Sequence, residues 1–91
     1  MLFHLTTRGA WQEAVAAGEY TTASAFIHLS TERQWPRTRT RWFGTATDLV
    51  LLVIAPDRVR GEIRYEAADG DLFPHLYGVL PVEAVVEVRE L

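Results

Sequence analysis

The sequence predicts a compact α+β domain in which a mostly antiparallel β-sheet is accompanied by two helices, both early in the chain. Three observations support this class. Residues 48–54 are almost uninterruptedly apolar, which is typical of a strand buried on both faces. The patterns of both helices lie before residue 45, and short β-prone segments separated by turn residues fill most of the second half. A chain of 91 residues with 48% hydrophobic content fits one folded domain spanning residues 1–91.

The first elements follow from apolar spacing and capping residues. A strand is expected over Leu2–Thr6 and a helix over Arg8–Ala17. Thr6 or Thr7 is placed to cap this helix, because a threonine hydroxyl accepts a hydrogen bond from the free N–H groups of the first turn. Gly18 is the expected stop, since glycine adopts the left-handed conformation that ends many helices.

The next segment, Phe26–Leu29, is expected to be a central strand that ends at the start of a second helix, with Ser30 as its N-cap. Pro36 does not fit inside a continuous helix. A turn over Thr31–Gln34, followed by a new helix with Pro36 in its first position and Gly44 as its end, is therefore predicted. The tryptophan-bearing side of this helix is expected to pack on the sheet.

The second half is expected to form the rest of the sheet, with residues 48–54 as its central strand. Polar and apolar residues alternate after that strand, and the glycine-containing segment 68–71 is a turn. The other expected elements are a strand over 62–66, an extended segment over 73–78, a short helical turn over 82–84 and a last strand over 85–89.

Composition excludes several kinds of site. There is no cysteine, so disulfides, thiolate metal sites and cysteine nucleophiles are absent, which suits a cytoplasmic protein. No apolar run reaches the ~20 residues of a membrane-spanning helix. The net charge of -3 argues against general nucleic-acid binding, although residues 32–41 hold four arginines and one acid.

Three histidines are the main candidates for chemistry. His4, His28 and His75 each lie in an apolar, strand-like setting. The segments around His4 and His28 share one pattern: two apolar residues, histidine, leucine, a hydroxyl residue and then a helix start. If the two strands are neighbours, their histidines converge on one cleft, which Ser30 would also line. The alternative is that each histidine is a hydrogen-bonded structural residue.

Other polar residues have a functional and a structural interpretation. Glu66 ends a strand beside a turn, where a carboxylate can orient a ribose hydroxyl or act as a base, or can simply be a surface residue. Arg41 and its neighbouring arginines suit phosphate, or form a solvated helix face. No spacing indicates zinc ligands on one helical turn, and no nucleophile elbow surrounds Ser24 or Ser30.

Several segments together resemble the bacterial family of unknown function numbered 952. The resemblance rests on residues 2–7, 25–31, 48–52 and 72–78, and it covers nearly the whole chain. The phrases around His28 and His75 are its most specific marks.

The arrangement is also similar to an ADP-ribosyltransferase-type fold, the split β-sheet that grips NAD, and most closely to the tRNA 2′-phosphotransferase family. That resemblance implies that His4 contacts a ribose hydroxyl of NAD, that the backbone after it holds the nicotinamide amide, and that His28 lies across the same cleft. Leu5 stands where that family has glycine, and Phe3 where it has arginine.

The hypothesis from the sequence is a domain that binds NAD or a related nucleotide, with NAD as a substrate of glycosidic cleavage. The alternatives are a non-enzymatic protein-interaction module and a histidine-based metal hydrolase. No metal ligands are assigned. The expected catalytic residues are His28 and Glu66, and the expected ligand-binding residues are His4, Thr6, Ser30, His75, Tyr77 and Arg41.

Overall fold

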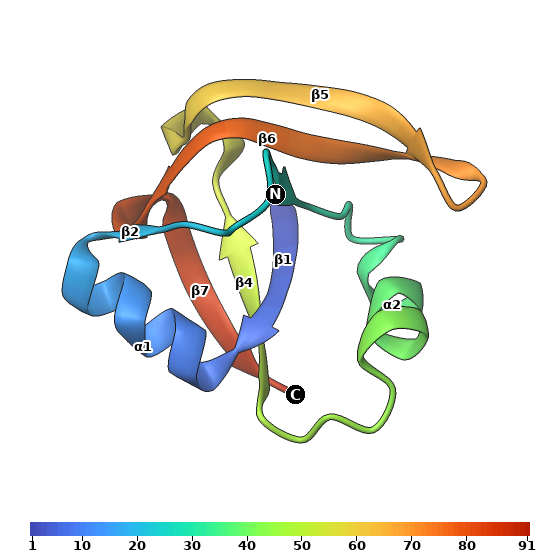
Figure 1. Ribbon diagram of the computed structural model, residues 1–91, viewed down its shortest axis with the longest axis horizontal. Coiled ribbons are helices and arrows are strands. Elements are labelled where there is room, and N and C mark those ends of the chain that lie inside the picture. Colours follow the sequence, from blue (N-terminus) through green and yellow to red (C-terminus); the bar gives the residue numbers. More distant parts are fainter.

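The structure, a computed structural model that describes residues 1–91, is α+β, with two short helices and antiparallel sheets (Figure 1). No helix in it has the length and apolar character needed to cross a membrane. The elements, in order, are β1 (Leu2–Thr7), α1 (Arg8–Ala17), β2 (Glu19–Tyr20), β3 (Ile27–His28), α2 (Trp35–Thr38) with a π-helical turn (Arg39–Phe43), β4 (Leu49–Ile54), a 3-10 turn (Pro56–Arg58), β5 (Arg60–Ala68), β6 (Asp71–Pro81), a 3-10 turn (Val82–Ala84) and β7 (Val85–Glu90).

The first sheet has the strand order β1–β4–β7, with β4 in the centre as predicted. All six residues of β4 are buried. Val50, Leu52 and Ile54 face the core shared with the second sheet. Leu51 and Val53 point the other way, into a smaller cluster that is covered by the α2 segment. Burial on both faces therefore explains the uninterrupted apolar sequence of this strand.

The second sheet is built on the long β5–β6 hairpin, which arches over the first sheet in Figure 1. The other edge of β6 pairs with β2 and then with β3, where His28 is opposite His75. The predicted central strand Phe26–Leu29 is therefore wrong in extent, since only Ile27–His28 is a strand. Its continuation pairs with the first sheet instead, through a bridge between Phe3 and Ser30.

The ends of α1 confirm the predicted caps. Thr7 Oγ1 accepts a hydrogen bond from the N–H of Ala10 at 3.1 Å. Gly18 has a φ of 87° and donates its N–H to Ala14 O. The turn into α2 differs from the prediction, because Ser30 is not the N-cap: its backbone is used in the bridge to Phe3.

The α2 segment begins at Trp35, so Pro36 lies in its first turn, one position later than predicted. The expectation that both tryptophans pack on the sheet is half right. Trp35 contacts the smaller core cluster, but Trp42 is 63% exposed. The cause is the π-helical turn, closed by a hydrogen bond from Gly44 N to Arg39 O: its wider turn rotates residue 42 away from the face of residue 35.

Two glycines allow β5 and β6 to approach closely near one end of the hairpin. Gly61 is opposite Gly78, and a Cβ at Gly78 would overlap the carbonyl of Arg60 and lie 2.8 Å from Gly61 Cα. We expect Gly78→Ala to lower the free energy of unfolding by about 1–3 kcal/mol, because the strands must shift apart. Urea denaturation measures this.

Gly9→Ala is the matched control, because a Cβ at this helical position meets nothing within 4 Å. It should raise stability by roughly 0.5–1 kcal/mol, through helix propensity. Equal effects of the two substitutions would contradict the packing explanation.

Candidate functional site

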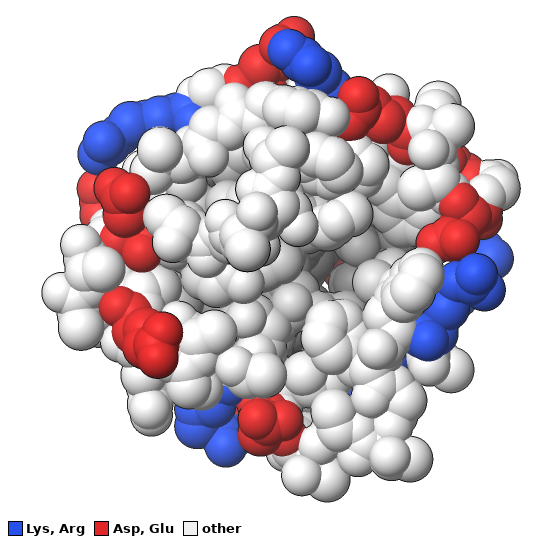
Figure 2. Space-filling view, in the orientation of Figure 1, with Lys and Arg blue, Asp and Glu red and all other residues white.

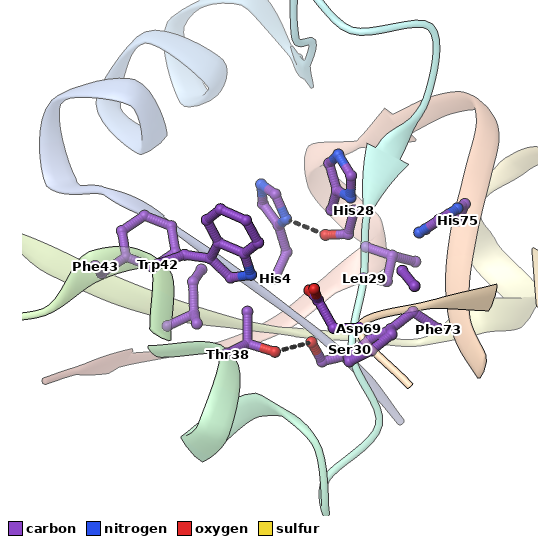
Figure 3. A pocket seen from close by; sticks show the side chains of 12 residues that line it. His4, His28, Leu29, Ser30, Thr38, Trp42, Phe43, Asp69, Phe73 and His75 are labelled. Atoms are coloured by element: carbon purple, nitrogen blue, oxygen red, sulfur yellow. Dashed lines mark hydrogen bonds between the residues drawn. The ribbon is translucent and has the colours of Figure 1, made fainter. Parts of the chain in front are cut away.

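A cavity of about 430 Å³ lies where the two sheets meet the α2 segment (Figure 3). Both sheets, the α2 segment and the β5–β6 turn contribute to its wall. Among the predicted site residues, it brings together the three histidines and Ser30. The lining residues are His4, Leu5, His28, Leu29, Ser30, Thr38, Trp42, Phe43, Ala68, Asp69, Phe73 and His75.

The histidines converge because the two similar sequence segments are neighbours. Phe3 and Ser30 exchange backbone hydrogen bonds, each of 2.8 Å, which places β1 beside the chain that leaves β3. His4 Nδ1 then reaches the carbonyl oxygen of His28 at 2.6 Å. The two segments therefore converge on one cleft, as predicted.

The hydrogen bonds of His4 define its protonation. The His28 carbonyl only accepts, so His4 Nδ1 carries the proton and donates it. His4 Nε2 therefore accepts from the Tyr20 hydroxyl at 3.0 Å, and Tyr20 in turn accepts from Thr6 Oγ1 at 3.1 Å. Burial favours this neutral ring and lowers the pKa of His4 from 6.5 to about 4. Both nitrogens of His4 are used within the protein, so its ring forms part of the cavity wall and has no free hydrogen-bonding group for a ligand.

His75 has a different arrangement of partners. Its Nδ1 lies 2.8 Å from Glu66 Oε1, which also accepts a 2.6 Å hydrogen bond from the Tyr77 hydroxyl. These two hydrogen bonds lower the pKa of Glu66, so it is a carboxylate that only accepts. His75 Nδ1 is consequently the protonated nitrogen. Nε2 makes no hydrogen bond to the protein and is not sealed from solvent, although the residue is buried.

Phe26 holds the two remaining imidazoles in place. Its ring stacks on that of His75, with centroids 4.1 Å apart, and meets the ring of His28 edge-on at 4.7 Å. The His28 ring lies 5.1 Å from that of His75 and makes no hydrogen bond. Partial burial, followed by the charge of a protonated His75, lowers the pKa of His28, so the ring favours its neutral form.

Ser30 lines the cavity without the partners of a nucleophile. Its hydroxyl lies 3.4 Å from that of Thr38, which donates to Gln34 O at 3.3 Å. No histidine is hydrogen-bonded to Ser30, so the geometry does not favour serine–histidine catalysis.

The other predicted residues lie outside the cavity lining. Thr6 is buried and bonds Tyr20 behind the cavity. Glu66 and Tyr77 support His75 from the β5–β6 side, with the guanidinium of Arg64 4.2 Å above the Tyr77 ring. Arg41 lines a neighbouring groove and pairs with Asp69 at 3.3 Å.

Charge is distributed around the edge of this side of the molecule. In Figure 2 the arginines and acids lie at the periphery, and the centre is uncharged and hollowed. Such a surface offers no continuous positive track for a nucleic-acid backbone.

The histidines are not arranged as metal ligands. No group of three His, Cys, Asp or Glu side chains is placed to hold a metal ion. The hydrogen bonds give the reason: both nitrogens of His4 are occupied, and Nδ1 of His75 is held by Glu66. The geometry therefore does not favour the metal-hydrolase alternative.

Phe26, Tyr20 and Asp69 are among the residues of the site region that were not expected from the sequence. Phe26 is two positions before His28, so strand alternation places both on one face, and that signal was available. Tyr20 and Asp69 gave no local signal, because their partners are 16 and 28 positions away in the sequence.

Comparisons with known proteins agree with the first resemblance. A family model described as protein of unknown function, DUF952, matches residues 5–88. The chain is similar to the crystal structure of protein CC0527 from Caulobacter crescentus, at 32% identity and a TM-score of 0.89, covering 99% of this chain and 84% of that chain. The solution NMR structure of CC0527 gives 32% identity and a TM-score of 0.85, covering 99% and 83%. A search of curated proteins finds no match.

The pKa of His4 predicts a dependence of stability on pH. Because the pKa is lowered to about 4 in the folded state, the unfolded state binds more protons between pH 4 and 6.5, and stability falls as the pH falls through this range. At ~1.4 kcal/mol per pKa unit, His4 removes about 2 kcal/mol of unfolding free energy between pH 7 and 5.

His4→Asn tests this, since its amide can still donate to His28 O but does not titrate. Urea denaturation at both pH values should show a pH-dependent loss about 2 kcal/mol smaller in the variant. His28 titrates in both proteins and cancels in the comparison. Parallel pH profiles would contradict the assignment.

Proposed function

The chain belongs to the family of proteins of unknown function DUF952, and we propose that it is a domain that binds NAD or a related nucleotide in the cavity between its sheets. The observation that carries this proposal is a pair of imidazoles with unused nitrogens: the His28 ring makes no hydrogen bond within the protein, and His75 uses only Nδ1. Both residues line a cavity whose other walls are largely apolar and aromatic. A few polar groups in an apolar cavity are typical of small-molecule sites.

The dimensions and walls of the cavity favour a ring with an attached sugar. Phe43, Phe73 and Trp42 offer apolar surfaces, and about 430 Å³ accommodates part of a dinucleotide. Leu5 narrows one side, where an ADP-ribosyltransferase of the tRNA 2′-phosphotransferase type has glycine. The antiparallel sheets meeting at this cavity support an ADP-ribosyltransferase-like arrangement as part of the proposal.

The reaction that these groups suit is cleavage of the bond between nicotinamide and ribose. Nicotinamide leaves with the bonding electrons as a neutral ring, so no acid is needed for its departure. The attacking hydroxyl of water or of a second substrate forms the new bond to the ribose carbon and must lose a proton. His75 Nε2 accepts that proton, and the Glu66 carboxylate behind it stabilises the imidazolium that results.

In this proposal His75 is the base, in place of His28 as expected from the sequence, and Glu66 is a positioning residue. Glu66 Oε1 already accepts hydrogen bonds from His75 and Tyr77, so it orients the imidazole through Nδ1. The His28 ring, which makes no hydrogen bond within the protein, is the group available to a ribose hydroxyl or to the ligand amide.

A second candidate function is a non-enzymatic interaction module. The side chain of Trp42 is 63% exposed beside the cavity mouth, where it would suit a protein partner. The ligand titration below separates the two functions.

Binding predicts selective NMR shifts. On titration with NAD, ADP-ribose or nicotinamide, the imidazole and backbone resonances of His28 and His75 should move. Those of Asp57, which lies in the 3-10 turn after β4 and outside the cavity lining, should not. Phe73→Ala should weaken binding several-fold, because one aromatic wall is lost. The absence of any response to all three compounds, with the fold intact, would favour the interaction module.

Catalysis predicts a role for the charge of Glu66. Glu66→Gln should lower the rate of nicotinamide release from NAD by about 10- to 100-fold, with a small change in KM, because the imidazolium loses its counter-charge. Chromatography of the products measures this.

Glu87→Gln, the same change in β7, is the control and should keep the wild-type rate, because Glu87 pairs only with Arg89. A wild-type rate in Glu66→Gln would contradict the assigned role of the His75–Glu66 pair.

A further inference from the structure

An outer groove of about 590 Å³ adjoins the cavity. The cavity and the outer groove share Thr38, Trp42, Asp69 and Phe73, so a ligand can extend from one to the other. The outer groove differs in chemistry, because Arg37 and Arg41 lie along it where the cavity has histidines and apolar side chains.

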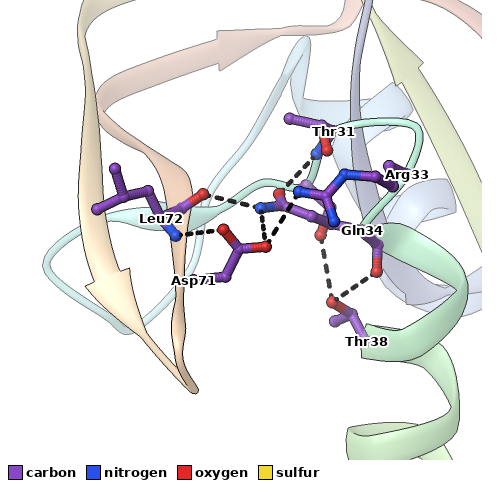
Figure 4. Close-up of polar contacts among 7 residues, drawn as sticks. Thr31, Arg33, Gln34, Thr38, Asp71 and Leu72 are labelled. Carbon is purple, nitrogen blue, oxygen red and sulfur yellow. Dashed lines mark hydrogen bonds and ion pairs between the residues drawn. The ribbon is translucent and has the colours of Figure 1, made fainter.

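Two acids also line the outer groove, and their ion-pair partners determine its net charge. Asp71 is held by Arg33 at 3.2 Å, by the side-chain amide of Gln34 at 3.2 Å and by the N–H of Leu72 at 2.8 Å (Figure 4). These contacts lower the pKa of Asp71 and satisfy its charge. Gln34 is buried and also bonds Leu72 O and Thr31 N, so this cluster is a fixed part of the groove wall.

The second acid, Asp69, forms a weaker contact. Its only ion pair is with Arg41, at 3.3 Å, and the side chains are 62% exposed for Arg41 and 35% exposed for Asp69. Exposed pairs of this kind contribute less than about 1 kcal/mol. Asp69 lies in the β5–β6 turn with a φ of 49°, and its carboxylate borders both the cavity and the outer groove.

Arg37 supplies the uncompensated positive charge. It is exposed, lines the outer groove and forms no ion pair or side-chain hydrogen bond. With Asp71 neutralised by Arg33, and Asp69 by Arg41, the outer groove has one net positive charge from Arg37. A phosphate that took the place of Asp69 on Arg41 would meet two guanidinium groups.

We propose that the outer groove binds the phosphate groups of a ligand whose ring and ribose occupy the cavity, with Arg37 and Arg41 as phosphate ligands and Asp69 as the competitor that holds Arg41 in the free protein. This inference rests on the proposed nucleotide-binding function and assigns its phosphate-bearing part. The ion pair between Arg41 and Asp69 lies between the two compartments, so phosphate binding frees the Asp69 carboxylate at the shared border.

Inorganic pyrophosphate tests the phosphate site without the ring. In an NMR titration at low ionic strength, it should shift backbone resonances of Arg37, Arg41 and Asp69 but leave His28 and His75 unmoved. Arg37→Gln should weaken its binding at least about fivefold, and added salt should weaken it further. Arg39→Gln is the matched control, because Arg39 donates to Gly44 O and does not line the outer groove.

Asp69→Asn, compared with loss of an acid elsewhere in the hairpin, tests the competitor. Asparagine tolerates a positive φ and removes the competitor, so pyrophosphate should bind about fivefold more tightly. Glu62→Gln changes the net charge equally on the other part of the hairpin and should leave binding unchanged.

Different results would overturn the phosphate site in the outer groove and the proposed binding of a ligand in the cavity. Equal weakening by Arg37→Gln and Arg39→Gln, unchanged binding in Asp69→Asn, or no response to pyrophosphate would overturn the phosphate site, even if nicotinamide still shifts His28 and His75. Pyrophosphate binding that depends on Arg37, without any response of the histidines to NAD or nicotinamide, would instead remove the cavity proposal and keep an anion site in the outer groove.

Discussion

The backbone pairing of Phe3 with Ser30 is the constraint on which the site depends. Its two hydrogen bonds join the first sheet to the second at one point, just beyond β3. This pairing fixes the register of the two segments, so His4 lies beside the carbonyl of His28. Strand β6, which pairs with β3, holds His75 opposite His28. The cavity is therefore a consequence of how the sheets meet, and the buried strand β4 fixes the sheet beneath it.

Hydrogen bonding gives the three histidines different chemical states. His4 uses both nitrogens within the protein, His75 uses one and His28 uses none. Burial strongly disfavours protonation of His4, which acts as part of the framework. The rings of His75 and His28 lie 5.1 Å apart and both line the cavity, so the imidazole nitrogens without hydrogen bonds are gathered there.

Local patterns in the sequence predicted most of the fold. The caps at Thr7 and Gly18 and the doubly buried strand β4 follow from residue type and spacing, and the structure agrees. Ser30 was misassigned because its role is a pairing with a strand 27 positions earlier, which no local pattern contains. The exposure of Trp42 depends on a π-helical turn, which shifts the helical period by an amount that the sequence did not reveal.

The site was predictable in outline and not in its details. Similar segments around His4 and His28 indicated a shared cleft, but the hydrogen bond that occupies the second nitrogen of His4 comes from Tyr20 on a separate strand. Tertiary pairing across β5 and β6 likewise joins Glu66 to His75.

The most direct test of the proposed site is a crystal structure of the chain with ADP-ribose. We expect the terminal ribose to lie beside His28 and His75 Nε2, between the two sheets. A fully occupied ligand bound elsewhere, with this cavity empty, would contradict the proposed site.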